Sequence, residues 1–359
     1  MYKGKSISVA VATYNGDKYL KEQLESICSQ TIIPDEIVIS DDGSTDKTET
    51  IVNEIINKYA SDSLKISFIR NNGIHGVCKN FENALMNCAG DYIFLSDQDD
   101  IWMGDKVKKV IHIFEQEPTA LCVAHDAILV DRFGNKIDGI INNEVNGERL
   151  ELPINDYAHL SKNEWLEFSV TRSLVNGMVM CITSSFLQKC LPFPNVRFHD
   201  QWISYMSIKN DGFYFLNEFL AKYRLHGSNT CGNRAYRGNM FQILKKKQEK
   251  FLKNDNSYTL VYLPISYSIR EDLEKSGMSD TSAYTTAKRI EEIGKTLFKI
   301  EIASSLYGLV RLVRFFQTDM RYRRTGRGQF IYEFIYILLT SRRKRVNNLK
   351  QVTIDEHLI

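Results

Sequence analysis

Residues 92–100 read Tyr92-Ile93-Phe94-Leu95-Ser96-Asp97-Gln98-Asp99-Asp100, so three carboxylates directly follow a short run of residues with strand character. Like charges this close repel one another, and the arrangement is costly unless a divalent cation or a ligand with donor groups neutralises it. Carboxylate oxygens are hard ligands that suit magnesium or manganese, and these ions in turn bind phosphates. The alternative is a strand that ends in an acidic, solvated turn, and this stretch alone favours neither interpretation.

Strand and helix signals alternate through the first 130 residues. Short apolar runs predict strands at residues 7–12, 36–40, 66–69 and 92–95, with helices between them. This alternation predicts an α/β fold with a mostly parallel central sheet covered by helices on both faces. Such a sheet binds ligands outside the carboxyl ends of its strands, which is where the polar clusters of this chain fall. Residues 138–165 are polar and predict loops, and helical character dominates after residue 235.

The composition excludes several classes of protein. The chain has 359 residues, and its 46 basic and 44 acidic residues leave a net charge of +2, which gives no general affinity for nucleic acid. Seven cysteines form no CxxC or Cys/His zinc pattern, so we expect reduced thiols in a cytoplasmic protein. We expect neither a secretory signal nor a transmembrane helix. The absence of a GxGxxG motif disfavours a Rossmann dehydrogenase.

Four polar motifs follow one another between residues 13 and 102: Thr13-Tyr14-Asn15, then Asp41-Asp42-Gly43-Ser44-Thr45-Asp46, then Asn72-Gly73 with Asn80, and then Ser96-Asp97-Gln98-Asp99-Asp100-Ile101-Trp102. In this order and spacing they resemble the family 2 glycosyltransferases, enzymes with the nucleotide-diphospho-sugar-binding fold called GT-A. The last motif also looks like the rhamnosyltransferase-type branch of bacterial surface-polysaccharide enzymes. The resemblance implies a GT-A catalytic domain over residues 1–232, with a nucleotide-sugar-binding half at 1–120 and an acceptor half at 121–232. A helical, basic region would follow over residues 233–359.

The first two motifs suit the recognition of a nucleoside. Asp41, at the end of the second predicted strand, can accept a hydrogen bond from a pyrimidine N3–H. The resemblance implies this role for Asp41, with Asp42 beside it, and implies backbone contacts from the Thr13-Tyr14-Asn15 turn to base and ribose. The alternative for both acids is an Asx turn before the next helix. Asp46 and Glu49 are predicted to form a capping pair for that helix.

The acidic motif suits a diphosphate and its cation. In an extended chain Asp97 and Asp99 project to the same side, so one cation or one ribose–metal assembly can meet both. By resemblance, Asp97 faces the ribose and Asp99 binds the Mn²⁺ or Mg²⁺ ion that bridges the diphosphate. We expect Asp100 to turn away and cap the helix that follows, and Trp102 to pack in the core.

Further polar residues have two open interpretations each. Asn72 and Asn80 either hold the sugar-nucleotide pocket or act as loop and cap residues. In the related enzymes a histidine at the place of His226 reaches the metal or the diphosphate, although a lone histidine is more often structural. Arg224 could offset phosphate charge.

Transfer to a hydroxyl acceptor needs a general base, and the resemblance implies one at the start of a helix, in the region of residues 197–202. Asp200 is the candidate, and the amino terminus of a helix predicts a lowered pKa for its carboxyl group. The alternative is that Asp200 only caps this helix. The family's more common Glu-Asp pair is His199-Asp200 here. Gly177 resembles the glycine of the acceptor-side loop, where the missing side chain lets a substrate approach.

The carboxyl-terminal region carries a separate hypothesis. Between residues 311 and 345 there are ten Lys and Arg residues but only Asp319 and Glu333 as acids, among apolar and aromatic residues at helical spacing. This pattern predicts contact with anionic lipid at the inner face of the plasma membrane. The alternative is a helical appendage packed on the core or at a homodimer interface.

These observations predict an inverting, metal-dependent glycosyltransferase of surface-polysaccharide biosynthesis. The resemblance implies a UDP- or dTDP-sugar as donor, with dTDP-rhamnose as one candidate, and a glycan or lipid-linked acceptor. One alternative is a non-catalytic scaffold that binds sugar nucleotides and kept the fold. Another is a nucleotidyltransferase, but such enzymes usually carry a Gly-rich phosphate loop after the first strand, and Thr13-Tyr14-Asn15-Gly16 is not one.

Overall fold

The computed structural model describes residues 4–140, 144–145, 148–149, 156–171, 173–194, 199–226 and 258–301. The chain divides into two compact units, one formed by residues 1–193 with 198–235 and the other by residues 194–197 with 236–359. The predicted boundary between residues 232 and 233 falls outside the described residues.

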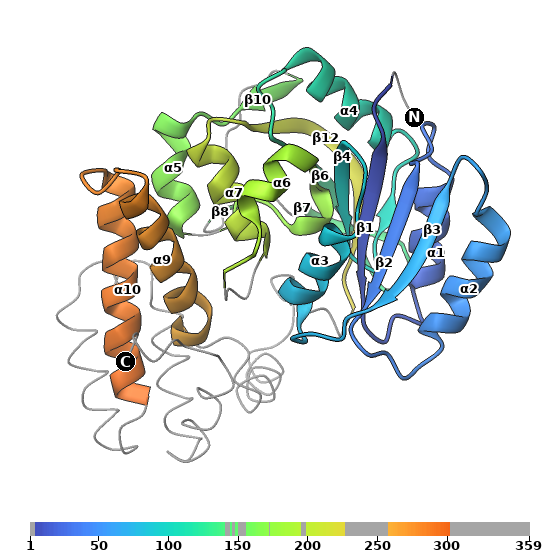
Figure 1. Ribbon diagram of the computed structural model, residues 1–359, viewed down its shortest axis with the longest axis horizontal. Helices are drawn as coiled ribbons and strands as arrows, with labels where there is room; N and C mark the ends of the chain where they lie inside the picture. The colour runs from blue at the N-terminus through green and yellow to red at the C-terminus, as the bar shows by residue number, and fades with distance from the viewer. Residues whose placement is uncertain are drawn as a thin grey trace. The chain divides into compact units, whose positions relative to one another are not determined.

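The first unit is built on a mixed sheet in the order β10-β12-β6-β11-β4-β1-β2-β3, with β5 paired to β12 and β7 paired to β6 (Figure 1). Its strands are β1 (Ile7–Thr13), β2 (Glu36–Asp41), β3 (Lys65–Arg70), β4 (Tyr92–Ser96), β5 (Ile101–Trp102), β6 (Cys122–Val130), β7 (Lys136–Ile140), β10 (Tyr157–His159), β11 (Met180–Thr183) and β12 (Phe213–Arg224). A separate small hairpin pairs β8 (Glu144–Val145) with β9 (Glu148–Arg149). The strands expected at residues 7–12, 36–40, 66–69 and 92–95 are confirmed.

The strands β3, β2, β1 and β4 run parallel to one another. The parallel arrangement expected from the sequence is therefore confirmed for this half of the sheet. Strand β11 enters antiparallel between β4 and β6, which makes the sheet as a whole mixed. The order of the strands reverses between β1 and β4, because β2 and β3 lie on one side of β1 while β4 lies on the other. Such a reversal is where open α/β sheets bind ligands.

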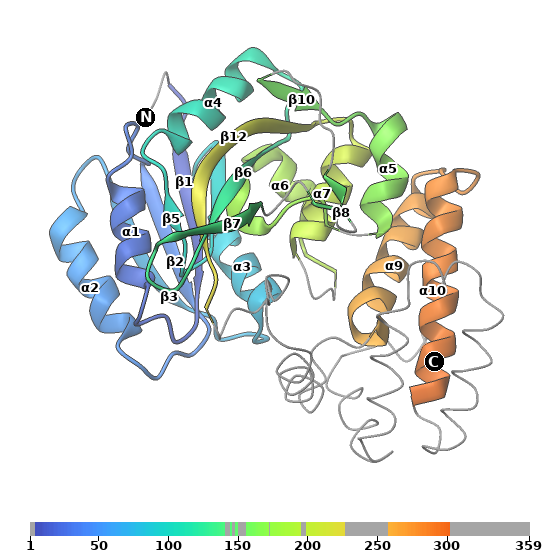
Figure 2. The same cartoon turned by 180° about the vertical axis from the view of Figure 1, so that it is seen from behind.

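Helices cover both faces of this sheet. They are α1 (Leu20–Cys28), α2 (Thr48–Tyr59), α3 (Val77–Met86), α4 (Lys106–Gln116), α5 (Lys162–Thr171), α6 (Ser184–Cys190) and α7 (His199–Lys209), with a 3₁₀ turn at Gly177–Val179. Figures 1 and 2, which view the molecule from opposite sides, show α1 on one face of β1 and β2 and α3 on the other. Because both faces are covered, β1 and β2 are almost wholly buried, which explains their continuous apolar runs.

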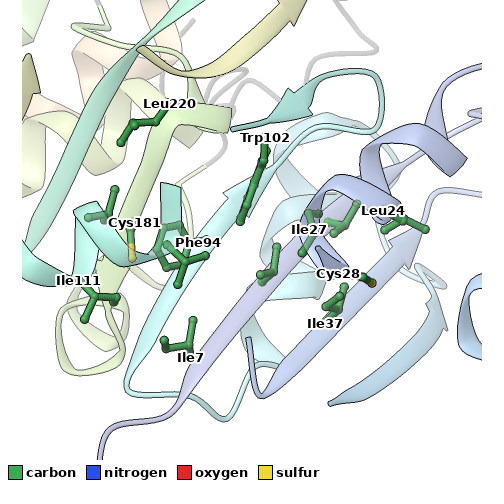
Figure 3. Packing of buried hydrophobic residues seen from close by; sticks show 14 of the residues in the cluster. Ile7, Leu24, Ile27, Cys28, Ile37, Phe94, Trp102, Ile111, Cys181 and Leu220 are labelled. Carbon is green, nitrogen blue, oxygen red and sulfur yellow. The ribbon is translucent and has the colours of Figure 1, made fainter. Parts of the chain in front are cut away.

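The main core lies on the face of the sheet that α1 and α4 cover. Leu24 and Ile27 of α1 pack with Ile37 of β2, and Ile111 of α4 packs with Phe94 of β4 (Figure 3). These apolar positions recur at helical spacing in α1 and α4 and line one side of each helix. Burial of such side chains stabilises the fold and so keeps the ends of these strands next to one another.

Three expectations need correction. Residues 138–165 were expected to form loops, but β7 reaches residue 140, β10 spans 157–159 and α5 begins at residue 162. Asp46 accepts a hydrogen bond from the backbone N–H of Thr48 at 3.0 Å, but Glu49 does not complete a capping pair, because its carboxylate pairs with Arg70 at 2.6 Å. Asp100 does not cap α4. It is buried and accepts a hydrogen bond from the backbone N–H of Arg224 at 3.1 Å.

The described part of the second unit consists of two helices, α9 (Tyr258–Lys275) and α10 (Ser282–Glu301), which pack against each other. Arg270 joins them by pairing with Glu291 at 2.5 Å, and it also pairs with Glu274 at 2.7 Å. Within the described residues, no helix combines the length and the hydropathy that crossing a bilayer requires. The basic stretch at residues 311–345 lies outside the described residues, so the contact with a membrane or partner subunit stays a prediction.

Candidate functional site

The turn that follows β1 is held from two sides. Gln98, in the acidic motif, accepts hydrogen bonds from the Thr13 hydroxyl at 2.7 Å and from the Tyr14 N–H at 2.9 Å, and its amide donates to the Tyr14 carbonyl at 3.1 Å. On the other side, the N–H of Asn15 donates to the Ser44 hydroxyl at 2.8 Å. The turn predicted to contact a nucleoside is therefore preformed, and the Tyr14 ring is exposed. The role of Gln98 was not foreseen from the sequence.

Asp41 takes up the alternative role that the sequence left open. Its carboxylate is fully buried and accepts the N–H groups of Gly43 at 3.1 Å and Ser44 at 3.0 Å, which is an Asx turn. The same carboxylate also pairs with Arg70, at the end of β3. Asp41 is thus bonded within the protein, and the hydrogen bond to a pyrimidine N3–H stays a prediction. Arg70 is exposed at this edge of the sheet, and it pairs with Glu49 as well as with Asp41.

Asp42 organises the segment between β3 and α3. It accepts the amide of Asn71 at 2.7 Å and the Gly76 N–H at 2.8 Å, and His75 lies 3.0 Å from it. Gly76 has a φ angle of 122°, a conformation that favours glycine. Asn72 is exposed and the structure gives it no such contact, so the asparagine that orders this segment is its neighbour Asn71.

Asn80 lies in the interior, with 3% of its surface exposed. Its amide donates to the carbonyl of Thr13 at 3.1 Å and to that of Ser40 at 3.0 Å, and its oxygen accepts the Ser40 hydroxyl at 2.6 Å. Asn80 therefore ties the carboxyl ends of β1 and β2 to α3. Asn80 is neither a loop nor a cap residue, because it lies within α3, and its part in the sugar-nucleotide pocket stays a prediction.

Asp97, Asp99 and Asp100 form an acid rim at the end of β4. Burial and the charges of Asp99 and Asp200 raise the pKa of Asp97 to about 7, although the charge of Lys106 opposes the shift. Burial, followed by Asp99 and Asp97, holds the pKa of Asp100 well above its usual range. Both pKa values are thus raised by burial first and by neighbouring like charges second, and a nearby cation would lower them.

His226 completes the outer part of the rim. Its Nε2 atom lies 2.7 Å from Asp99 Oδ2, and its ring packs on Tyr19 at a centroid distance of 4.8 Å. Both Asp99 and His226 are half-buried. The structure thus brings together the two residues that were predicted as metal ligands. Asp99 lies in the segment after β4, and His226 lies two residues after the end of β12.

Arg224 has a different role from the one considered. Only 2% of it is exposed, and its guanidinium donates to Glu22 at 2.5 Å and to the Asp99 carbonyl at 3.0 Å. It also lies over the Tyr19 ring, 4.7 Å from its centroid. A group buried in this way does not offset phosphate charge directly. Instead, Arg224 holds the backbone carbonyl of Asp99 in place from the protein interior.

Lys106 is the buried cation beneath the acid rim. Its ammonium donates to the Met178 carbonyl at 2.8 Å and lies 3.8 Å from the centroid of the Trp102 ring. Burial lowers its pKa to about 7, and the charges of Asp100 and Asp97 oppose that shift. Lys106 is therefore hydrogen-bonded to Met178, the residue after Gly177, and interacts electrostatically with Asp100 and Asp97. Trp102 is buried as predicted.

Asp200 lies in the first turn of α7, and its carboxylate accepts a hydrogen bond from the backbone N–H of Gln201 at 2.7 Å. Burial raises its pKa to about 6, against the opposing effect of the backbone N–H groups of Gln201 and Gly177. The expected lowering of this pKa by the helix terminus is therefore wrong, because burial outweighs it. Its charge contributes to the raised pKa of Asp97, so the acceptor-side acid lies within electrostatic range of the acid rim.

Gly177 makes room for His199 rather than for a substrate. A Cβ atom at residue 177 would overlap His199 Nε2 and lie 3.1 Å from its Cε1. The His199 ring is 5% exposed and packs on Phe81, with ring centroids 4.1 Å apart. Burial lowers the pKa of His199 to about 3, so this imidazole is neutral. It packs at the start of α7 and thereby holds Asp200 in place.

Replacing Gly177 by alanine is expected to lower the free energy of unfolding by about 1–3 kcal/mol, the usual cost of overpacking. The added methyl must displace the His199 ring, which Phe81 blocks from behind. Chemical denaturation measures this loss. Gly104→Ala is the matched control, because a Cβ there meets no atom within 4 Å. Equal stability of the two variants would contradict the packing role of Gly177.

The donor set around Asp99 and His226 fits a hard divalent cation. No group of three or more His, Cys, Asp or Glu residues within the described parts of the chain is arranged to hold a metal. A Mg²⁺ or Mn²⁺ ion commonly takes only one or two protein ligands and completes its shell with substrate phosphates and water. The carboxylate and imidazole, 2.7 Å apart, fit that pattern.

Known proteins resemble this chain in sequence and in fold. The family model described as glycosyl transferase family 2 matches residues 8–167. An uncharacterized glycosyltransferase of Nostoc sp. is 27% identical over 274 residues, which are 75% of this chain and 80% of that protein. The dTDP-rhamnosyl transferase RfbG of Shigella flexneri is 41% identical over 104 residues, or 28% of this chain and 35% of RfbG. The crystal structure of S. aureus TarS 1–349 superposes with a TM-score of 0.52 at 16% identity, covering 96% of this chain and 92% of that one.

Proposed function

Because this chain belongs to glycosyl transferase family 2 and has the GT-A fold, we propose that it is an inverting enzyme that transfers a sugar from a nucleoside diphosphate donor to a glycan or lipid-linked acceptor in surface-polysaccharide biosynthesis. One observation carries this proposal. Asp97 and the Asp99–His226 pair lie at the end of β4, beside the reversal of strand order, and the charge of Asp200 acts on Asp97. A donor-side acid rim and an acceptor-side base within electrostatic range are what a single displacement requires.

Asp200 is the proposed general base. Its carboxylate removes the proton of the acceptor hydroxyl while that oxygen attacks the anomeric carbon of the donor. The bond from this carbon to the diphosphate oxygen breaks at the same time, and attack from the opposite face inverts the anomeric configuration. A pKa of about 6 suits this task, because the carboxylate is ionised at neutral pH yet more basic than an exposed aspartate.

Asp99 and His226 are the residues that would hold a Mn²⁺ or Mg²⁺ ion. When bound, such an ion supplies positive charge near the diphosphate and stabilises the leaving group. Arg224 holds the Asp99 carbonyl from the interior, and Tyr19 packs on the imidazole, so both ligands are oriented in advance. Asp97 is the proposed ribose contact. It directly precedes Gln98, whose side chain is hydrogen-bonded to Thr13 and Tyr14 in the turn after β1.

The donor proposed here is a UDP- or dTDP-sugar, with dTDP-rhamnose as the first candidate. The similarity to RfbG, at 41% identity, supports this choice, although it spans only 104 residues. The exposed ring of Tyr14, in the turn after β1, is the proposed contact surface for the base.

Calorimetric titration of the full chain with UDP, dTDP, UDP-sugars and dTDP-rhamnose, each with Mn²⁺ and then Mg²⁺, tests the proposal. We expect one pyrimidine nucleoside diphosphate to bind, and to bind more tightly when a divalent cation is present. Transfer assays with the best donor, followed by NMR of the product's anomeric proton, then test inversion. Binding without turnover on any glycan or lipid-linked acceptor would instead support the scaffold interpretation, and failure to bind any of these nucleotides would contradict the proposal.

A further inference from the structure

The side chain of Gln98 joins two parts of the candidate site that are distant in sequence. Both polar backbone atoms of Tyr14 are bonded to it, since the N–H donates to Gln98 Oε1 at 2.9 Å and the carbonyl accepts from Gln98 Nε2 at 3.1 Å. The Thr13 hydroxyl adds a third bond to Oε1 at 2.7 Å. Residue 98 thus pairs with the turn as a neighbouring strand would, although it lies between two acids of the acid rim.

From this geometry we propose that Gln98 is a positioning residue that couples the turn after β1 (Thr13–Gly16, hereafter the β1 turn) to the acid rim. The inference rests on the proposed function, in which the β1 turn contacts the nucleoside and Asp99 serves the diphosphate. Gln98 then sets the spacing between the two contacts. One amide then holds the two halves of the nucleoside diphosphate site at a fixed spacing.

The chemistry of the three bonds requires an amide at residue 98. One oxygen must accept two donors while the neighbouring nitrogen donates to a carbonyl. Glutamate keeps the accepting oxygen but places a second oxygen against the Tyr14 carbonyl, where it has no proton to donate. Methionine has a similar length and makes none of the three bonds. The two substitutions therefore remove the contact in graded steps.

The β1 turn is shaped to receive this amide. A Cβ atom at Gly16 would overlap Gln98 Oε1 and lie 2.9 Å from the Thr13 hydroxyl oxygen. Asn15 has a left-handed φ of 48°, a conformation that asparagine adopts more readily than most residues and that suits a sharp turn before Gly16. On the opposite side, Gly16 donates its N–H to Thr48 Oγ1 at 2.8 Å, at the start of α2. The turn is thus fixed to α2 on one side and to the acid rim, through Gln98, on the other.

The coupling predicts a result that a purely structural role does not. In the wild type, Mn²⁺ should strengthen nucleoside diphosphate binding by a measurable factor, and that factor should fall toward one when Gln98 is replaced. Affinity for Mn²⁺ alone should not fall in Gln98→Glu, because the added negative charge favours a cation. A loss of nucleotide affinity in that variant therefore cannot come from a weaker metal site.

The experiment compares the full-length wild type with Gln98→Glu, Gln98→Met and the control Gln116→Glu, which makes the same change at the exposed last residue of α4. Hydrogen exchange by mass spectrometry on the ligand-free proteins reads the Tyr14 amide directly. We expect exchange in the peptide around residue 14 to be about tenfold faster in Gln98→Met, because a protecting bond is lost. Calorimetry with UDP or dTDP, whichever binds the wild type, should show a dissociation constant raised about tenfold in both variants at residue 98, consistent with loss of one or more hydrogen bonds.

A double-mutant cycle with Gly16→Ala gives a second measurement if Gln98→Met unfolds. Because Gly16→Ala disturbs the same contact from the other side, its effect and that of Gln98→Glu on nucleotide affinity should be strongly non-additive. Unchanged exchange around Tyr14, or an unchanged factor between metal and nucleotide binding in both variants of Gln98, would overturn the coupling role while the proposed function stands. A wild type that binds no nucleoside diphosphate would overturn both.

Discussion

Replacing Asp200 by asparagine is expected to lower kcat by about 10²- to 10⁴-fold, the range that loss of a general base produces. Asparagine has the same shape, and its oxygen can still accept the Gln201 N–H that Asp200 accepts at 2.7 Å, so α7 should keep its start. It cannot take a proton from the acceptor hydroxyl. The affinity for the nucleotide donor should therefore stay nearly unchanged, which initial rates and calorimetry measure together.

The pH dependence gives the same assignment a second measurement. Burial raises the pKa of Asp200 to about 6, and a base acts only as the carboxylate, so kcat/KM should fall as the pH drops through that value and level off above it. Asp62→Asn, at an exposed turn, should keep both the rate and the pH profile of the wild type. Near-wild-type turnover in Asp200→Asn would leave Asp200 as a helix-terminal residue only.

The parallel half of the sheet could be predicted from sequence because its signals are local. Strands β1, β2, β3 and β4 are short apolar runs that end in polar turns, and the helices between them repeat apolar residues at helical spacing. Burial on both faces leaves such a run no other stable environment. The antiparallel entry of β11 between β4 and β6 could not be read in this way, since nothing within Met180–Thr183 states its partners.

The position of the candidate site at the carboxyl ends of the strands could be predicted from the sequence. The hydrogen-bond and ion-pair partners of its residues could not, because they come from distant parts of the chain. Asp41 was recognised as a strand-end acid, yet its partner Arg70 comes from the end of a different strand. Asp100 was expected to serve the adjacent helix, and it bonds instead to the backbone of Arg224, which is 124 residues away. Gln98 carried a readable signal, because a glutamine set between acids at a strand end adds a donor where only acceptors were expected.

Burial also reversed one electrostatic expectation. A carboxylate at a helix amino terminus is ordinarily more acidic than in water, and the sequence supported that expectation for Asp200. The tertiary fold packs Phe81, His199 and the Gly177 loop around the start of α7, and the resulting desolvation dominates. The direction of a pKa shift therefore follows from packing that no local pattern contains. For the proposed reaction this reversal is favourable, since it makes the base stronger.

Replacing Asp99 by alanine is expected to reduce kcat/KM by about 10²-fold or more, the cost of losing a main electrostatic contact to the leaving group. The carboxylate of Asp99 lies against the His226 imidazole, with Oδ2 2.7 Å from Nε2. The response to added Mn²⁺ or Mg²⁺ should be lost with it, which rates measured after chelation and re-addition of each cation test. His226→Ala should retain part of that response, because the carboxylate of Asp99 remains.

Stability separates this effect from a loss of fold. The charge of Asp99 is among the causes that raise the pKa values of Asp97 and Asp100, so its removal relieves repulsion, while the lost bond to His226 has the opposite effect. The two changes oppose each other, and the Tm of Asp99→Ala should stay close to that of the wild type. Asp280→Ala, an exposed acid between α9 and α10, is the control that should change neither rate nor Tm. An inactive variant of unchanged stability is the result expected of a residue kept for binding a cation, whereas full activity in Asp99→Ala would mean that the acid rim serves another purpose.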